Sequence, residues 1–217
     1  MVRQIQLSHV RQDMPHGRQH GQIRMEASQI RILAFAGSAH RGSLNKKTVS
    51  VAVDGARAAG AQVTVIDLRD YPLPLFDQDV EALEGVPANA VKLKELFKSH
   101  HGFLIACPEY NVSVTPLLKN LIDWVSRKTK DEPLRAAFKG KAAALMAASP
   151  GASGGSRGMA HLREILEYTG VVVLPRQVAL PKADEAFDPD GTLKDPGQKA
   201  SLRDLGSELV QFLAKTV

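Results

Sequence analysis

The stretch IRILAFAGSAHRGSLN, at residues 30–45, joins a short apolar run to a turn rich in glycine and serine. Its first seven residues are apolar apart from one arginine and do not alternate with polar residues, which is typical of a strand buried on both faces. Gly37 and Gly42 bound the turn, and Ser43 is a favoured residue at the start of a helix. This order of strand, turn and helix predicts the first unit of a parallel sheet covered by helices.

The same order recurs along the rest of the chain. Thr115 followed by Pro116 marks the start of one helix, and Gly170 marks the end of another. Further strands are predicted at 62–68, 102–107, 141–148 and 171–174. The helices are predicted at 44–59, 88–99, 116–127, 156–169 and 198–215, with long loops at 69–85 and 181–196.

Five strands that alternate with helices predict an α/β fold of three layers, with a parallel sheet between two layers of helices. Right-handed crossovers restrict the topology, and five strands favour the doubly wound, flavodoxin-like strand order 2-1-3-4-5. In such a sheet the turns after the strands meet at the carboxyl edge, where the ligand binds. The chemistry of the chain is therefore expected in the turns that follow the first, third and fourth strands.

The composition is that of an ordinary globular protein, with 217 residues, 44% hydrophobic and 24% charged. This length suits one domain, which we place at 30–217, and the Gln-, His- and Arg-rich residues 1–29 predict a flexible tail. No apolar run approaches the roughly 18–20 residues that cross a bilayer. The net charge is +5, but no basic stripe is interleaved with aromatic residues. We therefore expect neither a membrane nor a nucleic acid as partner.

The only cysteine is Cys107, which excludes an internal disulfide framework and favours a cytoplasmic location. The Cys-x5-Arg motif of low-molecular-weight phosphatases needs an arginine where Ser113 stands, so we interpret Cys107 as a small buried strand residue. His100 and His101 lie side by side before the third strand. Without a carboxylate at ligand spacing, they indicate the C-terminal end of a helix and no metal site.

The turn after the first strand has the composition of a phosphate site. Its small residues let backbone N–H groups approach an anion, and the start of the next helix adds about half a positive charge. Ser38, Ser43 and Asn45 supply further donors, and either His40 or Arg41 supplies a cation. An ordinary capped turn is the alternative interpretation, because Ser43 suits a helix cap in either case.

Two other phosphate motifs are excluded at this turn. A Walker A loop needs a lysine after its second glycine, and Ser43 stands there. The dinucleotide fingerprint needs a second glycine two residues after the first, and Ala39 stands there. The turn therefore suits one terminal phosphate better than a pyrophosphate.

The segment CPEYN at 107–111 adds a carboxylate, an aromatic ring and an amide at the same edge of the sheet. A planar heteroaromatic ligand needs this mixture, because it has a flat face to pack on and polar atoms around its rim. The alternative interpretation is a turn in which Tyr110 and Asn111 only satisfy the local backbone.

The third turn, SPGASGGS at 149–156, contains a formal Gly-x-Ser-x-Gly match centred on Ser153. A serine hydrolase would also need a later histidine as general base, and the only one is His161, within the helix that follows directly. A side chain there does not easily reach back to Ser153. The other interpretation is a glycine-rich loop that wraps the polar edge of a flat ligand.

Three motifs together resemble the NADPH-dependent FMN reductase family, whose relatives include chromate, quinone and azo reductases. They are Gly-Ser-x4-Ser-x-Asn at 37–45, Pro-Glu-Tyr-Asn at 108–111 and Leu-Lys-Asn-x2-Asp-Trp at 118–124. The resemblance spans about 30–173, and its second and third motifs are the most specific. It implies a flavodoxin-like fold, bound FMN, and self-association to a dimer or tetramer.

The resemblance also implies which residues contact FMN. Around the phosphate it places Ser38, His40, Ser43, Leu44 and Asn45. Along the isoalloxazine it places Pro108, Glu109, Tyr110 and Asn111. Near the pyrimidine side it places Ser149, Pro150, Gly151 and Ser153. A structural role at the subunit contact is implied for Lys119, Asn120, Asp123 and Trp124.

The chain departs from the family pattern at two positions. The family often has arginine where His40 stands, and Arg41 is expected to compensate. It also often has an aromatic residue where Val112 stands, so the pocket is expected to be more open on that side.

The function implied is an FMN-dependent NAD(P)H oxidoreductase. NADPH or NADH passes hydride to the flavin, which then reduces a small acceptor such as a quinone, free flavin, chromate or an azo compound. A flavodoxin-like electron carrier, a redox-sensing module and a serine hydrolase at Ser153 are the alternatives. Carriers are usually acidic, unlike this chain. The basic cluster of Arg127, Lys128 and Lys130 is interpreted as a contact for the NADPH 2′-phosphate or as a solvated face.

Overall fold

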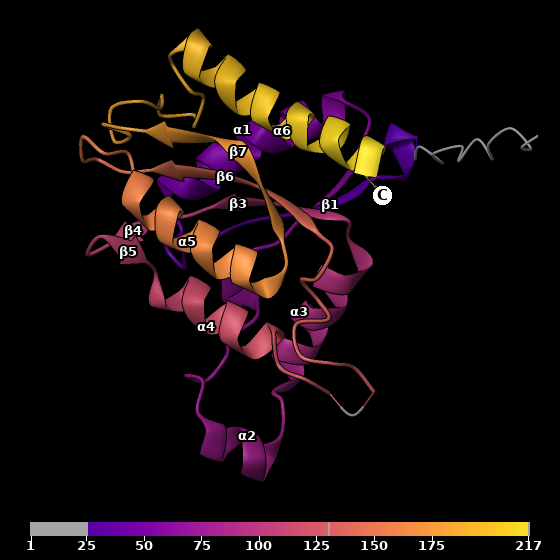
Figure 1. Ribbon diagram of the computed structural model, residues 1–217. Coiled ribbons are helices and arrows are strands. Elements are labelled where there is room, and N and C mark those ends of the chain that lie inside the picture. Colours follow the sequence, from indigo (N-terminus) through magenta and orange to yellow (C-terminus); the bar gives the residue numbers. More distant parts are fainter. Residues whose placement is uncertain (1–25, 130, 217) are drawn as a thin grey trace, which may run out of the picture.

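Figure 1 shows the computed structural model, which describes residues 26–129 and 131–216. A five-stranded parallel sheet forms the middle layer, in the order β2-β1-β3-β6-β7. Its strands are β1 (Arg31–Ala36), β2 (Gln62–Val65), β3 (Gly102–Ala106), β6 (Ala142–Ala148) and β7 (Val172–Leu180). The predicted three-layer, flavodoxin-like fold with strand order 2-1-3-4-5 is confirmed.

Helices cover both faces of this sheet (Figure 1). One face carries α1 (Leu44–Ala58) and α6 (Pro196–Thr216), and the other carries α3 (Ala88–Ser99), α4 (Pro116–Val125) and α5 (Ser156–Thr169). Ile32 and Ala34 of β1 belong to the core on the α1 side, whereas Leu33 and Phe35 belong to the core on the opposite side. Burial on both faces is the reason that the strand sequence does not alternate.

The edge strands differ from the sequence prediction. β2 ends at Val65, because Asp67 caps a short 3₁₀ turn, η2 (Leu68–Asp70). The sequence predicts that the last strand ends at residue 174, but β7 continues to Leu180 through an irregularity in its pairing with β6. The Arg163 guanidinium donates to the carbonyls of Val173 and Leu174 at 3.1 and 2.5 Å. This arginine satisfies carbonyls at the irregularity, where ladder pairing is interrupted.

Besides η2, three further short features lie where loops were predicted or where no element was assigned. The first is α2 (Gln78–Glu84), which extends from the main body at the lower end of Figure 1. The second is a hairpin of β4 (Glu109–Tyr110) and β5 (Ser113–Val114). The third is a 3₁₀ helix, η1 (Ala27–Gln29), within the predicted tail; residues 1–25 of that tail lie outside the described residues.

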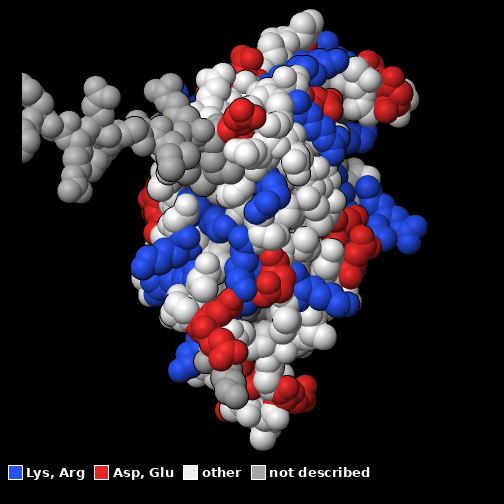
Figure 2. Space-filling model, turned by 90° about the vertical axis from the view of Figure 1, so that its right-hand side faces the viewer, with Lys and Arg blue, Asp and Glu red and all other residues white. Residues whose placement is uncertain are grey.

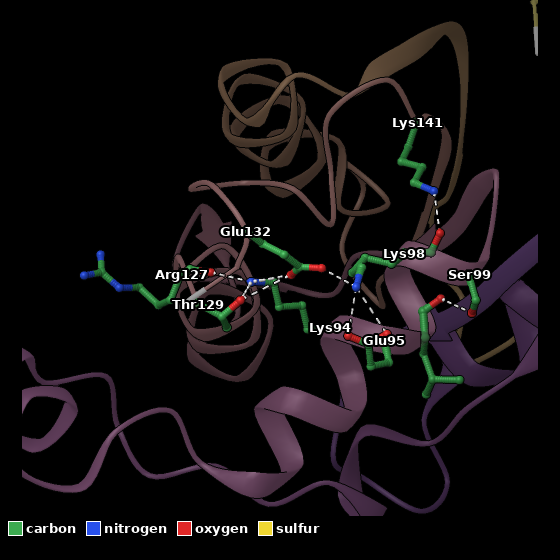
Figure 3. A network of polar contacts seen from close by, with 9 residues as sticks. Lys94, Glu95, Lys98, Ser99, Arg127, Thr129, Glu132 and Lys141 are labelled. Carbon is green, nitrogen blue, oxygen red and sulfur yellow. Dashed lines mark hydrogen bonds and ion pairs between the residues drawn. The ribbon is translucent and has the colours of Figure 1, made fainter.

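Polar contacts hold the connection from α4 to β6 against α3 (Figure 3). The buried Lys94 amine donates to the Arg127 carbonyl at 2.8 Å and pairs with the Glu132 carboxylate at 3.1 Å. Lys98 bridges Glu132 and Glu95 at the surface. Hydrogen bonds from Lys98 and Lys94 hold the pKa of the Glu132 carboxyl below its usual value. These side-chain contacts therefore hold the connection in place, although it contains little regular secondary structure.

The charged surface is mixed where Figure 2 displays it. Lysine and arginine side chains are interspersed with aspartate and glutamate, without one continuous basic stripe on this face. Within residues 26–129 and 131–216, no helix is both long and apolar enough to cross a membrane.

Candidate functional site

The three predicted turns meet at the carboxyl edge of the sheet. They surround an open cavity of about 330 Å³. Residues of the first turn that line it are Ser38, His40, Gly42, Ser43, Leu44 and Asn45. The other two turns contribute Pro108, Glu109, Tyr110, Ala148, Ser149 and Pro150. Gly42 and Ala148 were not predicted; both adjoin predicted residues, and their place in the lining depends on how the turns fold.

Some predicted residues are absent from the lining of this cavity in the described structure: Arg41, Asn111, Gly151 and Ser153. Arg41 is exposed next to His40, so the histidine forms the wall and the arginine does not. The Gly151 N–H donates to Ser149 Oγ at 3.2 Å, which curls the third turn back on itself. Ligand contacts of these residues remain a prediction.

Ser43 occupies the N-cap position of α1, as predicted. Its hydroxyl, however, makes no capping hydrogen bond within the described structure, which corrects the expectation of a conventional cap. The side chain is nearly buried and lines the cavity beside the positive end of the helix. A serine at this place, not committed to its own helix, is suited to donate to an anion.

Asn45 connects the first turn to the third. Its side chain is only 4% exposed. Its Nδ2 donates to the Ala148 carbonyl at 2.8 Å, and its Oδ1 accepts from the Ala148 N–H at 3.0 Å. One amide thus satisfies both backbone groups at the end of β6, and it holds two walls of the cavity at a fixed separation.

The carboxylate of Glu109 faces the start of α5. Its Oε2 accepts hydrogen bonds from the Arg157 and Gly158 N–H groups, each at 3.0 Å. These are first-turn amides that the helix itself leaves without partners. The neighbouring Tyr110 stays 55% exposed on the cavity wall. Glu109 therefore anchors the hairpin, while Tyr110 stays free to line the cavity.

The family of this chain follows from its similarity to known proteins. Residues 30–185 match the family model of NADPH-dependent FMN reductases. The chain belongs to this family. An NAD(P)H-dependent FMN reductase of Pseudomonas aeruginosa is 35% identical over 170 residues, which cover 78% of this chain and 87% of that protein. A quinone reductase of Escherichia coli K12 is 34% identical over 151 residues, which cover 68% of this chain and 75% of that protein.

Solved structures agree with this assignment. The flavoenzyme NAD(P)H:(acceptor) oxidoreductase of Paracoccus denitrificans superposes with a TM-score of 0.70 at 26% identity, over 86% of this chain and 98% of that chain. An archaeal flavodoxin superposes with a TM-score of 0.57 at 13% identity, over 85% of this chain and 99% of that chain. This similarity shows the shared fold alone. This FMN reductase family member is thus an oxidoreductase that uses FMN and NAD(P)H.

In this reductase, the Leu-Lys-Asn-x2-Asp-Trp motif holds the loop before α2. The Asn120 amide and the Trp124 indole both donate to the Pro74 carbonyl at 2.8 Å, and Asn120 Oδ1 accepts from the Phe76 N–H at 2.8 Å. Lys119 and Asp123 pair along α4 at 2.7 Å. The motif therefore has a structural role within one chain, and its predicted place at a subunit contact stays a prediction.

Thr115 also joins α4 to the site. As predicted, it caps the helix: its Oγ1 accepts from the Leu118 N–H at 3.2 Å. The same hydroxyl donates to the Gly37 carbonyl at 2.7 Å. A Cβ on Gly37 would lie 2.9 Å from the Leu118 side chain, so this close approach of turn and helix requires glycine.

Cys107 is buried, as predicted, but it follows β3 directly and does not belong to the strand. Burial, with a smaller contribution from the Glu109 charge, raises its pKa to about 12. The thiol therefore stays protonated at neutral pH, and it is not a nucleophile.

The other candidate centres do not assemble. His161 Nδ1 lies 3.0 Å from Ser113 Oγ, so the histidine that a hydrolase would need contacts the hairpin and makes no hydrogen bond to Ser153 in the described structure. His100 ends α3, with its Nδ1 at 2.6 Å from the Leu96 carbonyl, which confirms its role at the helix terminus. No cluster of metal-ligating side chains occurs in the described ranges.

The predicted cluster of Arg127, Lys128 and Lys130 is only partly available to bind the 2′-phosphate of NADPH. Arg127 pairs with Glu81 of α2 at 2.7 Å, and its guanidinium lies 5.2 Å from the centre of the Phe76 ring. Its charge is therefore used to fasten α2. Lys130 lies outside the described residues.

The residues of the cavity fit FMN. The first turn offers a helix N-terminus with the Ser43 hydroxyl and the His40 ring, a donor set for a phosphate monoester. The other two turns offer Tyr110 and the rings of Pro108 and Pro150, which suit a planar heteroaromatic ring. The lining thus holds both kinds of chemistry that FMN needs.

Proposed function

We propose that this chain is an FMN-dependent NAD(P)H oxidoreductase whose acceptor is a small molecule, namely a quinone, free flavin, chromate or an azo compound. The observation that carries the proposal is the cavity at the carboxyl edge, which is lined both by the start of α1 with its serines and by Tyr110, Pro108 and Pro150. Relatives named as FMN reductases and quinone reductases support the same chemistry.

The residues act by binding and orientation. Ser38, His40 and Ser43, with the first turn of α1, would hold the phosphate, and Arg41 would add charge from the rim. Pro108 and Tyr110 would lie along the ring.

The third turn would face the pyrimidine side of the ring, with Ser149, Pro150, Gly151 and Ser153 around it and Asn111 at the opposite rim. Backbone N–H groups there would stabilise negative charge at the ring edge. When bound, FMN supplies the acceptance and delivery of hydride. The protein then needs no general acid or base of its own.

The test is anaerobic reduction of the flavin. Purified protein mixed with FMN and either NADPH or NADH is expected to lose the visible absorbance of oxidised flavin, and added quinone is expected to restore it. FMN and nucleotide without protein are the control. If neither nucleotide bleaches the flavin faster than this control, the proposed reductase activity is wrong.

Self-association is also part of the proposal. None of the residues of α2 is buried, and Leu83 on it and Leu75 before it are 86% and 79% exposed. A seven-residue helix is marginal on its own, so an apolar partner surface would stabilise it. A second copy of this chain, as dimer or tetramer, would supply that surface. We further propose a cytoplasmic location, where NADH and NADPH are available.

A further inference from the structure

The tip of the β4–β5 hairpin has an unusual backbone. Glu109 pairs with Val114 and Tyr110 with Ser113, so Asn111 and Val112 form a two-residue loop. Both have positive φ angles, 48° and 70°. Such a loop is a type I′ turn, which prefers asparagine followed by glycine. Asn111 suits its position, but a β-branched residue at a positive φ is a true outlier.

Burial within the chain does not explain the valine. Its side chain is 48% exposed, so it gains little packing in return for the strained backbone. Glycine would adopt the same φ without strain. Strained residues of this kind cluster at functional sites, where the surrounding structure holds them in place.

The surroundings do hold this hairpin. Glu109 binds the first turn of α5, and the Ser113 hydroxyl contacts His161 at 3.0 Å. A Cβ on Gly158 would lie 3.2 Å from the Ser113 carbonyl, so α5 and the hairpin are in tight contact. These contacts hold both strands of the hairpin, so the tip does not relax by moving away from α5.

We propose that Val112 is a specificity-determining residue for the acceptor. The inference rests on the proposed function. Tyr110 and Pro108 line the cavity, and Val112 is an exposed apolar side chain two residues after Tyr110, at the tip of the same hairpin. An acceptor with two fused rings reaches further along this hairpin than an acceptor with one ring. Val112 therefore favours larger flat acceptors, and the strained turn keeps its side chain in that position.

The experiment compares two quinones on the wild-type holoenzyme and on Val112→Gly. Menadione has two fused rings, and para-benzoquinone has one. The glycine variant is expected to raise the KM for menadione at least about threefold more than the KM for para-benzoquinone, because only the larger quinone loses an apolar contact. Its Tm is expected to rise by about 2 °C, because the strain at residue 112 is relieved.

Val172→Gly is the matched control. Val172 is similarly exposed, but it is the first residue of β7. It therefore lies at the amino edge of the sheet, whereas the cavity lies at the carboxyl edge. Its glycine variant should lower the Tm and leave the ratio of the two KM values unchanged.

If the ratio of the two KM values is unchanged in an active Val112→Gly enzyme, Val112 does not determine acceptor specificity. If the Tm of the variant is unchanged or lower, the backbone at residue 112 is not strained. A wild-type protein that reduces neither quinone would overturn this inference and remove quinones from the proposed acceptors. The proposed function itself fails only if NADPH and NADH do not bleach the flavin.

Discussion

At the scale of single residues, Asn45 shows how a polar side chain next to a ligand site serves the fold. Its amide pairs with both backbone groups of Ala148 in a buried place. Sequence alone predicts a phosphate donor there, because asparagine after a glycine-rich turn has that chemistry. The tertiary structure instead commits Oδ1 and Nδ2 to the end of β6, so the residue positions two turns.

We predict that Asn45→Ala lowers the free energy of unfolding by about 2–4 kcal/mol, because two hydrogen bonds are lost and two buried backbone groups are left unpaired. Urea denaturation measures this change. FMN affinity, measured by fluorescence titration, is expected to fall at least about tenfold as the turns separate. Asn89→Ala, which removes an exposed hydrogen bond to the Pro72 carbonyl, is the control and should cost less than about 1 kcal/mol. Equal stability of both variants would contradict the role of Asn45.

At the scale of elements, α1 and α6 pack with their backbones in direct contact. A Cβ on Gly55 would lie 1.9 Å from the Arg203 carbonyl oxygen, and a Cβ on Gly206 would lie 2.0 Å from the Ala52 carbonyl oxygen. The two glycines thus let the layer on this side of the sheet close. A glycine within a helix costs about 1 kcal/mol of propensity, so close packing explains its presence in each.

Gly206→Ala is predicted to lower the free energy of unfolding by about 3 kcal/mol or more, despite the better helix propensity of alanine, because the methyl group overlaps the α1 backbone. Chemical denaturation tests this, with the exposed Gln211→Ala on the same helix as a control that should be nearly neutral. A stabilised Gly206→Ala protein would show that the helices can separate at no cost.

His100 makes the end of α3 sensitive to acid. Burial lowers the pKa of its imidazole, and the nearby Arg31 and Lys141 charges act in the same direction, although the Leu96 carbonyl opposes them. The unfolded chain therefore binds a proton on His100 at a higher pH than the folded chain does. By linkage, stability must fall as the pH drops below about 6.5, the ordinary histidine value, towards the lowered pKa.

We expect His100→Gln to lose less stability than wild type when denaturation is compared at about pH 7 and about pH 5. Glutamine keeps a hydrogen-bond donor for the helix end but does not titrate. The residual dependence reports on other groups, among them His101, whose pKa burial also lowers. The same pH dependence in both proteins would exclude His100 as its source.

At the scale of the whole molecule, α2 extends away from the layers that Figure 1 shows and exposes apolar side chains. Asn120 and Trp124 fasten the preceding loop, and Arg127 pairs with Glu81, so this arm is held in one place although it buries none of its own residues. An anchored projection that exposes Leu83 and, just before the helix, Leu75 is suited to contact another protein surface.

We predict that wild-type protein behaves as a dimer or tetramer in light scattering and that Leu83→Glu shifts it towards the single chain, since a charge on α2 is costly to bury in an interface. Val172→Glu, on the edge strand β7, which lies at the other end of the strand order from β2, should leave the mass unchanged. If the wild type is already a single chain, or if Leu83→Glu keeps the wild-type mass, α2 is not the contact.

The order of elements could be predicted from the sequence because it depends on local patterns. Apolar runs such as 30–36 cannot be left in water, and Thr115 and Gly170 mark helix ends by their own conformational preferences. The place of the cavity follows too, since parallel strands bring their following turns to one edge. The three motifs were sufficient to indicate the family.

Contacts between segments that are distant in the sequence could be identified only from the tertiary structure. Pairing of Asn45 with Ala148 and of Glu109 with α5 joins residues about 50 to 100 positions apart, and no local pattern records which partner an amide or a carboxylate will meet. The length of β7 is a further example. The strand continues beyond residue 174, and Arg163 donates to the carbonyls of Val173 and Leu174 where its pairing with β6 is irregular. Local preference sets where helices and strands begin, but the satisfaction of buried polar groups is a property of the assembled fold.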